Sequence, residues 1–136
     1  MARIAPAMSG IVRYGGSLAL ILGVMIWIGS STMTPWSGAS ASLINFHMLL
    51  GILAVLALWL LAAGYAMTGG NTMPLVISAV VVGLAQAVLG MTQQGLLSDA
   101  HWVIQVLHLL LGLGVIGVGE MMTMRMKKAR VAVAAK

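Results

Sequence analysis

Histidine is the residue type best suited to chemistry in this sequence, because the chain has no cysteine and only two carboxylates. The lack of cysteine excludes disulfides, thiolate nucleophiles, Cys-ligated zinc, iron–sulfur clusters and haem attached through Cys-x-x-Cys-His. Imidazole nitrogen remains as a ligand for a metal ion or for haem iron. The candidates are His47, His101 and His108.

Four apolar stretches must position these histidines. They cover residues 11–28, 43–67, 73–91 and 101–122, each near the roughly 20 residues that cross about 30 Å of hydrocarbon. The chain is 61% hydrophobic and 7% charged, against about 25% charged in soluble domains. The mean hydropathy is +1.08. This composition and the four stretches predict an all-α membrane protein in a lipid bilayer, folded as an antiparallel bundle of four transmembrane helices.

The charges predict the orientation of this bundle. Arg3 precedes the first stretch and Arg13 lies at its start, while a basic tail (residues 125–136) follows the last stretch. The loops after the first and third stretches carry no Lys or Arg. The positive-inside rule then puts both termini in the cytoplasm, with Trp36 and Trp102 at the outer boundary. We expect a multi-pass protein of a bacterial or archaeal cytoplasmic (inner) membrane. Basic residues confined to the termini argue against a nucleic-acid partner.

His47 and His108 lie on the second and fourth stretches, which both enter from the outer face. At about 1.5 Å per residue, His47 is expected about 7 Å deep and His108 about 12 Å deep. Two imidazoles at similar depth on alternate helices of a four-helix bundle can face each other across its axis, which suits the two axial positions of a haem iron. The alternative is a pair of histidines hydrogen-bonded between helices.

Small and polar residues accompany both histidines at helical spacing. His101, Gln105 and Gly112 share one helix face with His108, and Gly51 lies one turn after His47. A haem needs small residues where the backbone passes its plane, although close helix packing also uses glycine. A stripe on the third stretch comprises Gly83, Gln86, Gly90 and Gln93. The predicted cofactor-binding residues are His47, His108, Gly51, Gly112, Gln86, Gln105 and His101, with His47 and His108 as axial ligands of the iron.

The remaining ionisable residues have less specific roles. His101, at the outer boundary close to Asp99, can contact a haem propionate or a quinol, shuttle a proton, or simply be solvated at a helix start. Glu120 lies near the cytoplasmic end of the last stretch, within reach of Arg125 or Lys127. We interpret it as the partner in an interfacial ion pair rather than as a catalytic acid.

The order of these features resembles one four-helix half of the haem A synthase family, whose halves each carry a histidine on the second and fourth helices. The resemblance covers residues 11–122. Each motif is short, and their order and spacing carry the similarity. The matching segments are Arg13-Tyr14, His47-Met48-Leu49-Leu50-Gly51, Gln86-Ala87-Val88-Leu89-Gly90-Met91-Thr92 and Leu107-His108.

One departure concerns the reaction of that family. The catalytic half has Glu three residues before the histidine of its second helix, whereas this chain has Ile44 at that position, with Asn45 as the only polar neighbour. The resemblance therefore implies the architecture that holds haem b more than it implies hydroxylation of a haem methyl group.

These features together predict a b-type haem protein with bis-histidine ligation by His47 and His108, its haem nearer the outer leaflet. The expected role is electron transfer as a subunit or partner of a respiratory complex, in contact with other membrane subunits or with a second copy of the chain, and with quinone as a possible redox partner. One alternative is a half-size haem A synthase-like enzyme. Another is a haem-free accessory subunit of a larger membrane complex.

Overall fold

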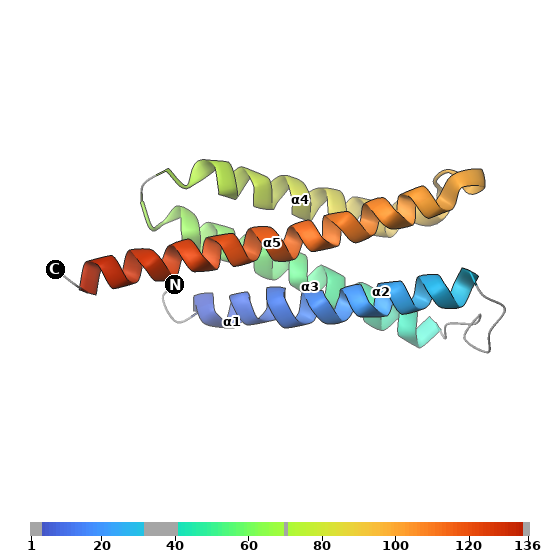
Figure 1. The fold of residues 1–136 in the computed structure, drawn as a ribbon, viewed down its shortest axis with the longest axis horizontal. Helices are drawn as coiled ribbons and strands as arrows, with labels where there is room; N and C mark the ends of the chain where they lie inside the picture. Colours follow the sequence, from blue (N-terminus) through green and yellow to red (C-terminus); the bar gives the residue numbers. More distant parts are fainter. Residues whose placement is uncertain (1–3, 32–40, 70, 135–136) are drawn as a thin grey trace.

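The protein is an all-α bundle of four antiparallel helical rods, which confirms the predicted fold class (Figure 1). The computed structural model describes residues 4–31, 41–69 and 71–134. The first rod combines α1 (Ile4–Gly10), the π-helix η1 (Ile11–Gly15) and α2 (Gly16–Ser31). The others are α3 (Ala41–Ala66), α4 (Met73–Thr92) and α5 (His101–Ala134), with the 3₁₀ turns η2 (Gln93–Gly95) and η3 (Ser98–Ala100) before α5.

Each rod is long and apolar enough to cross a bilayer. Within the described residues the four candidate spans are Ala5–Gly29, Ala41–Ala66, Met73–Thr92 and His101–Ala132. Large apolar side chains are exposed along all of them, as expected where lipid replaces water as the solvent. The chain is therefore a multi-pass membrane protein.

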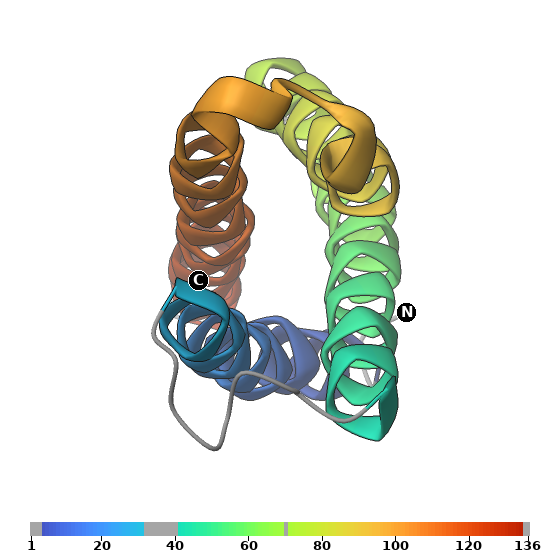
Figure 2. The same ribbon diagram turned by 90° about the vertical axis from the view of Figure 1, so that its right-hand side faces the viewer.

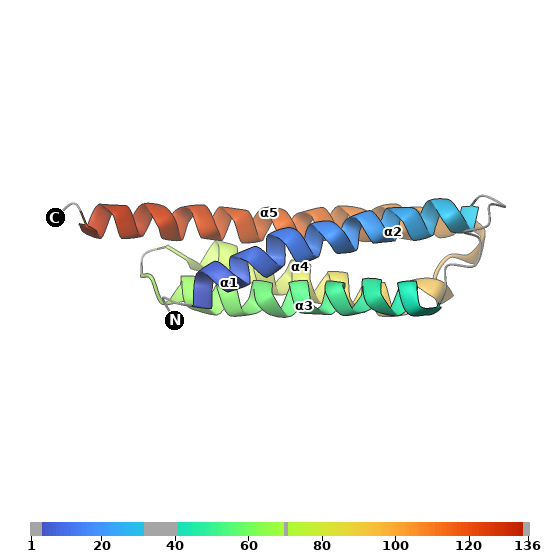
Figure 3. The same cartoon turned by 90° about the horizontal axis from the view of Figure 1, so that it is seen from below.

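The rods follow one another around the bundle, so that α5 returns to lie beside α2 (Figure 2). The start of α1 and the end of α5 lie at the same end, here called the terminal end, as an even number of spans requires (Figure 3). The opposite end, where α3 and α5 begin, is called the distal end. Trp102, at the start of α5, is exposed at the distal end.

Two rods extend beyond their predicted limits. The first begins at Ile4 instead of residue 11, so Arg13 lies well inside the rod and not at its start. The last continues to Ala134 instead of residue 122, because Ala, Met, Lys and Arg favour helix even where hydropathy falls. Arg3, Trp36 and Lys136, on which the predicted orientation partly rests, lie outside the described residues.

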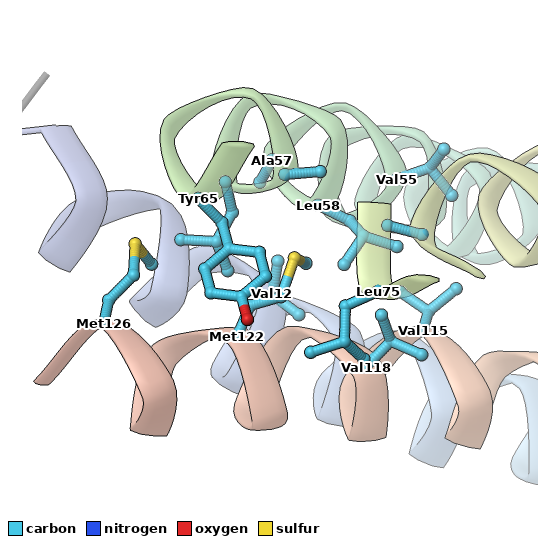
Figure 4. Close-up of a cluster of buried hydrophobic side chains, with 13 residues drawn as sticks. Val12, Val55, Ala57, Leu58, Tyr65, Leu75, Val115, Val118, Met122 and Met126 are labelled. Carbon is cyan, nitrogen blue, oxygen red and sulfur yellow. The ribbon is translucent and has the colours of Figure 1, made fainter. Parts of the chain in front are cut away.

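The terminal half of the bundle holds the packed core (Figure 4). Its largest fully buried side chains are Leu58, Leu61, Met122 and Val12. Val12 belongs to η1, and its Cγ1 lies 2.6 Å from where a Cβ on Gly119 would stand. Glycine at position 119 therefore allows the first rod and α5 to approach closely, as small residues do in membrane bundles.

The bundle consists of two similar hairpins, α2–α3 and α4–α5. Each places a histidine on its second helix. Each second helix then buries residues at the same steps from that histidine, about one turn apart and beginning about two turns after it. The corresponding buried pairs are Ala54 and Val115, Ala57 and Val118, Leu61 and Met122, and Tyr65 and Met126. The two histidines therefore occupy equivalent places in the fold.

Candidate functional site

Each histidine ring lies against a glycine of the preceding helix. A Cβ on Gly23 of α2 would stand 2.9 Å from Cε1 of His47, and a Cβ on Gly90 of α4 would stand 3.0 Å from Cε1 of His108. A larger residue at either position would displace the ring. Gly90 belongs to the predicted stripe on α4. Gly23 was not predicted, because spacing within one helix does not show which glycine will face a histidine of another.

The two rings meet across the bundle axis. Their centroids are 6.2 Å apart and their planes are inclined by 65°. From the starts of α3 and α5, His47 lies about 9 Å along its helix and His108 about 10 Å along its own, at about 1.5 Å per residue. The histidines are therefore closer to the same level than the predicted depths of about 7 and 12 Å.

The ring of His47 has a defined orientation. Its Nδ1 lies 2.8 Å from the backbone carbonyl oxygen of Ala19. Because a carbonyl only accepts hydrogen bonds, Nδ1 carries the proton and donates it, which leaves the lone pair on Nε2. A backbone carbonyl that fixes Nδ1–H in this way is the usual partner of a metal-binding imidazole.

The ring of His108 has a weaker set of partners. Its Nε2 lies 3.4 Å from Nε2 of Gln86, a long contact in which the amide is the donor. Within the described part of the chain, Nδ1 of His108 and Oε1 of Gln86 are buried without a hydrogen-bond partner. Buried polar atoms are almost always paired, with protein groups or with ordered water, so these two atoms mark a polar spot in the interior of the bundle.

A cavity of about 340 Å³ surrounds the two rings, with walls from all four rods. This volume falls in the range of small-molecule sites, about 300–1,000 Å³. The cavity lies in the distal half, beyond the packed core. A Cβ on Gly51 would meet no other described atom within 4 Å, whereas one on Gly112 would stand 3.4 Å from Gln86. All the predicted site residues line this cavity, namely His47, Gly51, Gln86, His101, Gln105, His108 and Gly112.

The residues around the cavity fit a haem better than a free metal ion. Among the described residues there is no group of three or more His, Cys, Asp or Glu side chains that could hold an ion. Haem iron needs only axial ligands from the protein. Two opposed metal–nitrogen bonds of about 2 Å place ring centroids about 6 Å apart, close to the separation of His47 and His108. An iron held by Nε2 of His108 would take the place of the Gln86 contact, so the Gln86 amide would have to turn aside.

The ion pair of Glu120 differs from the prediction. Its carboxylate binds Arg13, with Nε to Oε1 at 2.7 Å and Nη2 to Oε2 at 2.6 Å, and not Arg125 or Lys127. The hydropathy pattern had placed Arg13 at the start of the first helix, whereas the observed rod begins earlier and carries Arg13 in η1, opposite α5. The pair connects the two hairpins in the terminal half, away from the cavity.

Comparison with known proteins identifies no relative of this chain. No family model, no curated protein and no solved structure matches it. The resemblance to haem A synthases therefore rests on the residues quoted for it. Function is inferred below from the cavity and its two histidines.

Proposed function

We propose that this chain is a b-type haem protein in which His47 and His108 bind the iron from opposite sides, and that it transfers electrons within a membrane. The observation that carries the proposal is the pair of equivalent histidines, 6.2 Å apart in a cavity whose buried polar atoms lack partners. The bond from His47 to Ala19 favours the tautomer that ligation requires.

Each residue of the site has a role in holding haem b. His47 and His108 supply the axial nitrogens, while Gly23 and Gly90 make room for their rings. Bound haem supplies reversible one-electron chemistry at a potential set by its ligands and surroundings. Because histidines fill both axial positions, the iron retains no open position for oxygen or substrate, which favours electron transfer over catalysis.

The position of the cavity indicates where electrons enter and leave. The packed core fills the terminal half, whereas the cavity opens toward the distal half. With the basic residues inside, the distal end faces outward from a bacterial or archaeal cytoplasmic membrane. A single haem near that face does not span the bilayer, so the proposal includes a partner. The partner is a respiratory-complex subunit, a second copy of the chain or a membrane quinone.

The cavity wall gives less support to a half-size haem A synthase. Ile44 lines the cavity at the position where the catalytic half of that family has Glu, and the described lining residues include no carboxylate. Expression in a host that makes haem O tests this alternative, which predicts conversion to haem A. The third alternative, a haem-free accessory subunit, predicts purified protein without a Soret band.

The deciding experiment is the absorption spectrum of the full chain, purified after expression with sufficient haem. We expect the spectrum of a low-spin, six-coordinate haem. His47→Ala and His108→Ala should each lose it, because one axial ligand is removed. Leu49→Ala and Leu107→Ala serve as matched controls, since both side chains are exposed beside the histidines and should leave the spectrum unchanged. A native low-spin spectrum in both histidine variants would overturn the ligand assignment.

A further inference from the structure

The cavity is polar at only one of its ends. At the distal end its wall includes Gln93, His101 and Gln105, here called the polar mouth. At the opposite end the wall is formed by small and aliphatic residues, namely Gly16, Ala54, Val55, Gly112 and Val115. A ligand with polar groups on one edge therefore has one favourable orientation in this cavity.

His101 is the only residue of the polar mouth that can carry charge. Its Nδ1 lies 3.3 Å from the carbonyl oxygen of Leu96, so Nδ1 is the donor and Nε2 remains to accept a proton or a bond. The side chain is half-buried. The described residues of the distal half include no Lys or Arg, so His101 is the available cation for an anionic group at this end.

We infer that the polar mouth binds the carboxylates of the ligand in this cavity, with His101 as their principal partner. The inference rests on the proposed function, in which the ligand is haem b, a macrocycle with two carboxylates on one edge. A carboxylate among Val55 and Val115 would be desolvated without a partner, at high cost. At the mouth it would receive a charge-assisted bond from His101 and amide bonds from Gln93 and Gln105. The carboxylate edge therefore points to the distal end.

The test compares haem b with its dimethyl ester, in which both carboxylates are blocked. Each ligand is titrated into the purified full chain and followed by the Soret band. We expect the wild type to prefer haem b by about tenfold. His101→Leu should bind both ligands about equally, and His101→Gln should retain part of the preference. Leu107→Ala, an exposed position of α5 outside the cavity wall, is the control and should leave the preference unchanged.

The possible outcomes separate this inference from the proposed function. If His101→Leu weakens both ligands equally, or leaves the wild-type preference intact, His101 is not the carboxylate partner and the inference is wrong. Iron-free protoporphyrin and its dimethyl ester, followed by fluorescence, repeat the comparison without axial ligation and should show the same preference. If neither haem b nor its ester shifts its Soret band to the low-spin form on addition of the wild type, the proposed function fails, and this inference fails with it.

Discussion

The hairpins α2–α3 and α4–α5 build the same arrangement from different residues. Each places a histidine on its second helix and a glycine against that ring on its first. One turn before the glycine, however, α2 has Ala19 and α4 has Gln86. The small side chain of Ala19 leaves its carbonyl open to His47, whereas the long side chain of Gln86 reaches His108 itself. The same backbone arrangement therefore gives His47 a fixed backbone partner and gives His108 a side-chain partner that can move, here called the adjustable partner.

The hairpins also differ at corresponding positions of the core. Leu58 of α3 and Gly119 of α5 stand at the same step from their histidines. They face each other, since a Cβ on Gly119 would be 3.5 Å from Cδ1 of Leu58. A large residue opposite a small one allows two similar helices to interdigitate, which two leucines or two glycines would not achieve. The two hairpins therefore carry matching residues around the cavity, whereas in the core a large residue of one hairpin packs against a small residue of the other.

The largest expected effect comes from filling the space beside either ring. Gly23→Leu and Gly90→Leu would push a side chain into His47 and His108, whose Cε1 atoms lie 2.9 and 3.0 Å from where the new Cβ atoms would stand. We expect each variant to lose the low-spin spectrum while remaining in the membrane. Gly117→Leu is the control, because a Cβ there meets no other described atom within 4 Å.

Gly23→Ala and Gly90→Ala test how firmly each histidine ring is held. Gly23→Ala should disturb the spectrum more than Gly90→Ala, because the hydrogen bond to Ala19 prevents His47 from moving aside. The ring of His108 has only the long contact with Gln86 and can adjust. The opposite ranking, measured as the fraction of low-spin haem, would show that the two rings are not held as the structure indicates.

The next effect concerns stability. Leu58→Ala removes a fully buried side chain and leaves a cavity beside Gly119, which should cost about 2–5 kcal/mol of unfolding free energy. Folded protein should keep its low-spin spectrum, since Leu58 lies in the packed core and not in the cavity wall. Unfolding in detergent micelles measures the loss, with the exposed Leu60→Ala as control. Equal stability of the two variants would contradict the assigned core.

The number of helices and the approximate depth of the histidines could be predicted from the sequence, whereas side-chain contacts between helices could not. Helix length and topology alone predict four spans and bring His47 and His108 to one level. The contact of Gly23 with His47 was not predictable, because helices that are apolar all round do not reveal which face meets which neighbour. The partner of Glu120 was misjudged for a related reason. Hydropathy locates the lipid-crossing part of a helix but not its true ends, so Arg13 was placed at the start of the first helix and not within it.

A smaller effect is expected from the ion pair that joins the hairpins. Arg13→Gln and Glu120→Gln should each lower the Tm by a few degrees, because the side chain of Arg13 is 54% exposed and that of Glu120 23% exposed. The double variant should lose little more than either single variant, as two bonded partners do. Lys127→Gln is the control and should not couple to Glu120→Gln. Coupling of Glu120 to Lys127 instead would restore the pairing expected from sequence.

The smallest effect tests the adjustable partner directly. Gln86→Leu keeps the approximate volume of the side chain but removes an amide that competes with iron for Nε2 of His108 and an oxygen buried without a partner. Haem affinity should therefore rise by about two- to fivefold, the range of one weak hydrogen bond. Gln86→Glu should reduce affinity, since it buries a carboxylate. Soret titrations measure both. Weaker binding in Gln86→Leu would mean that the amide supports the bound haem, and that the two hairpins hold their histidines by more similar means than the structure indicates.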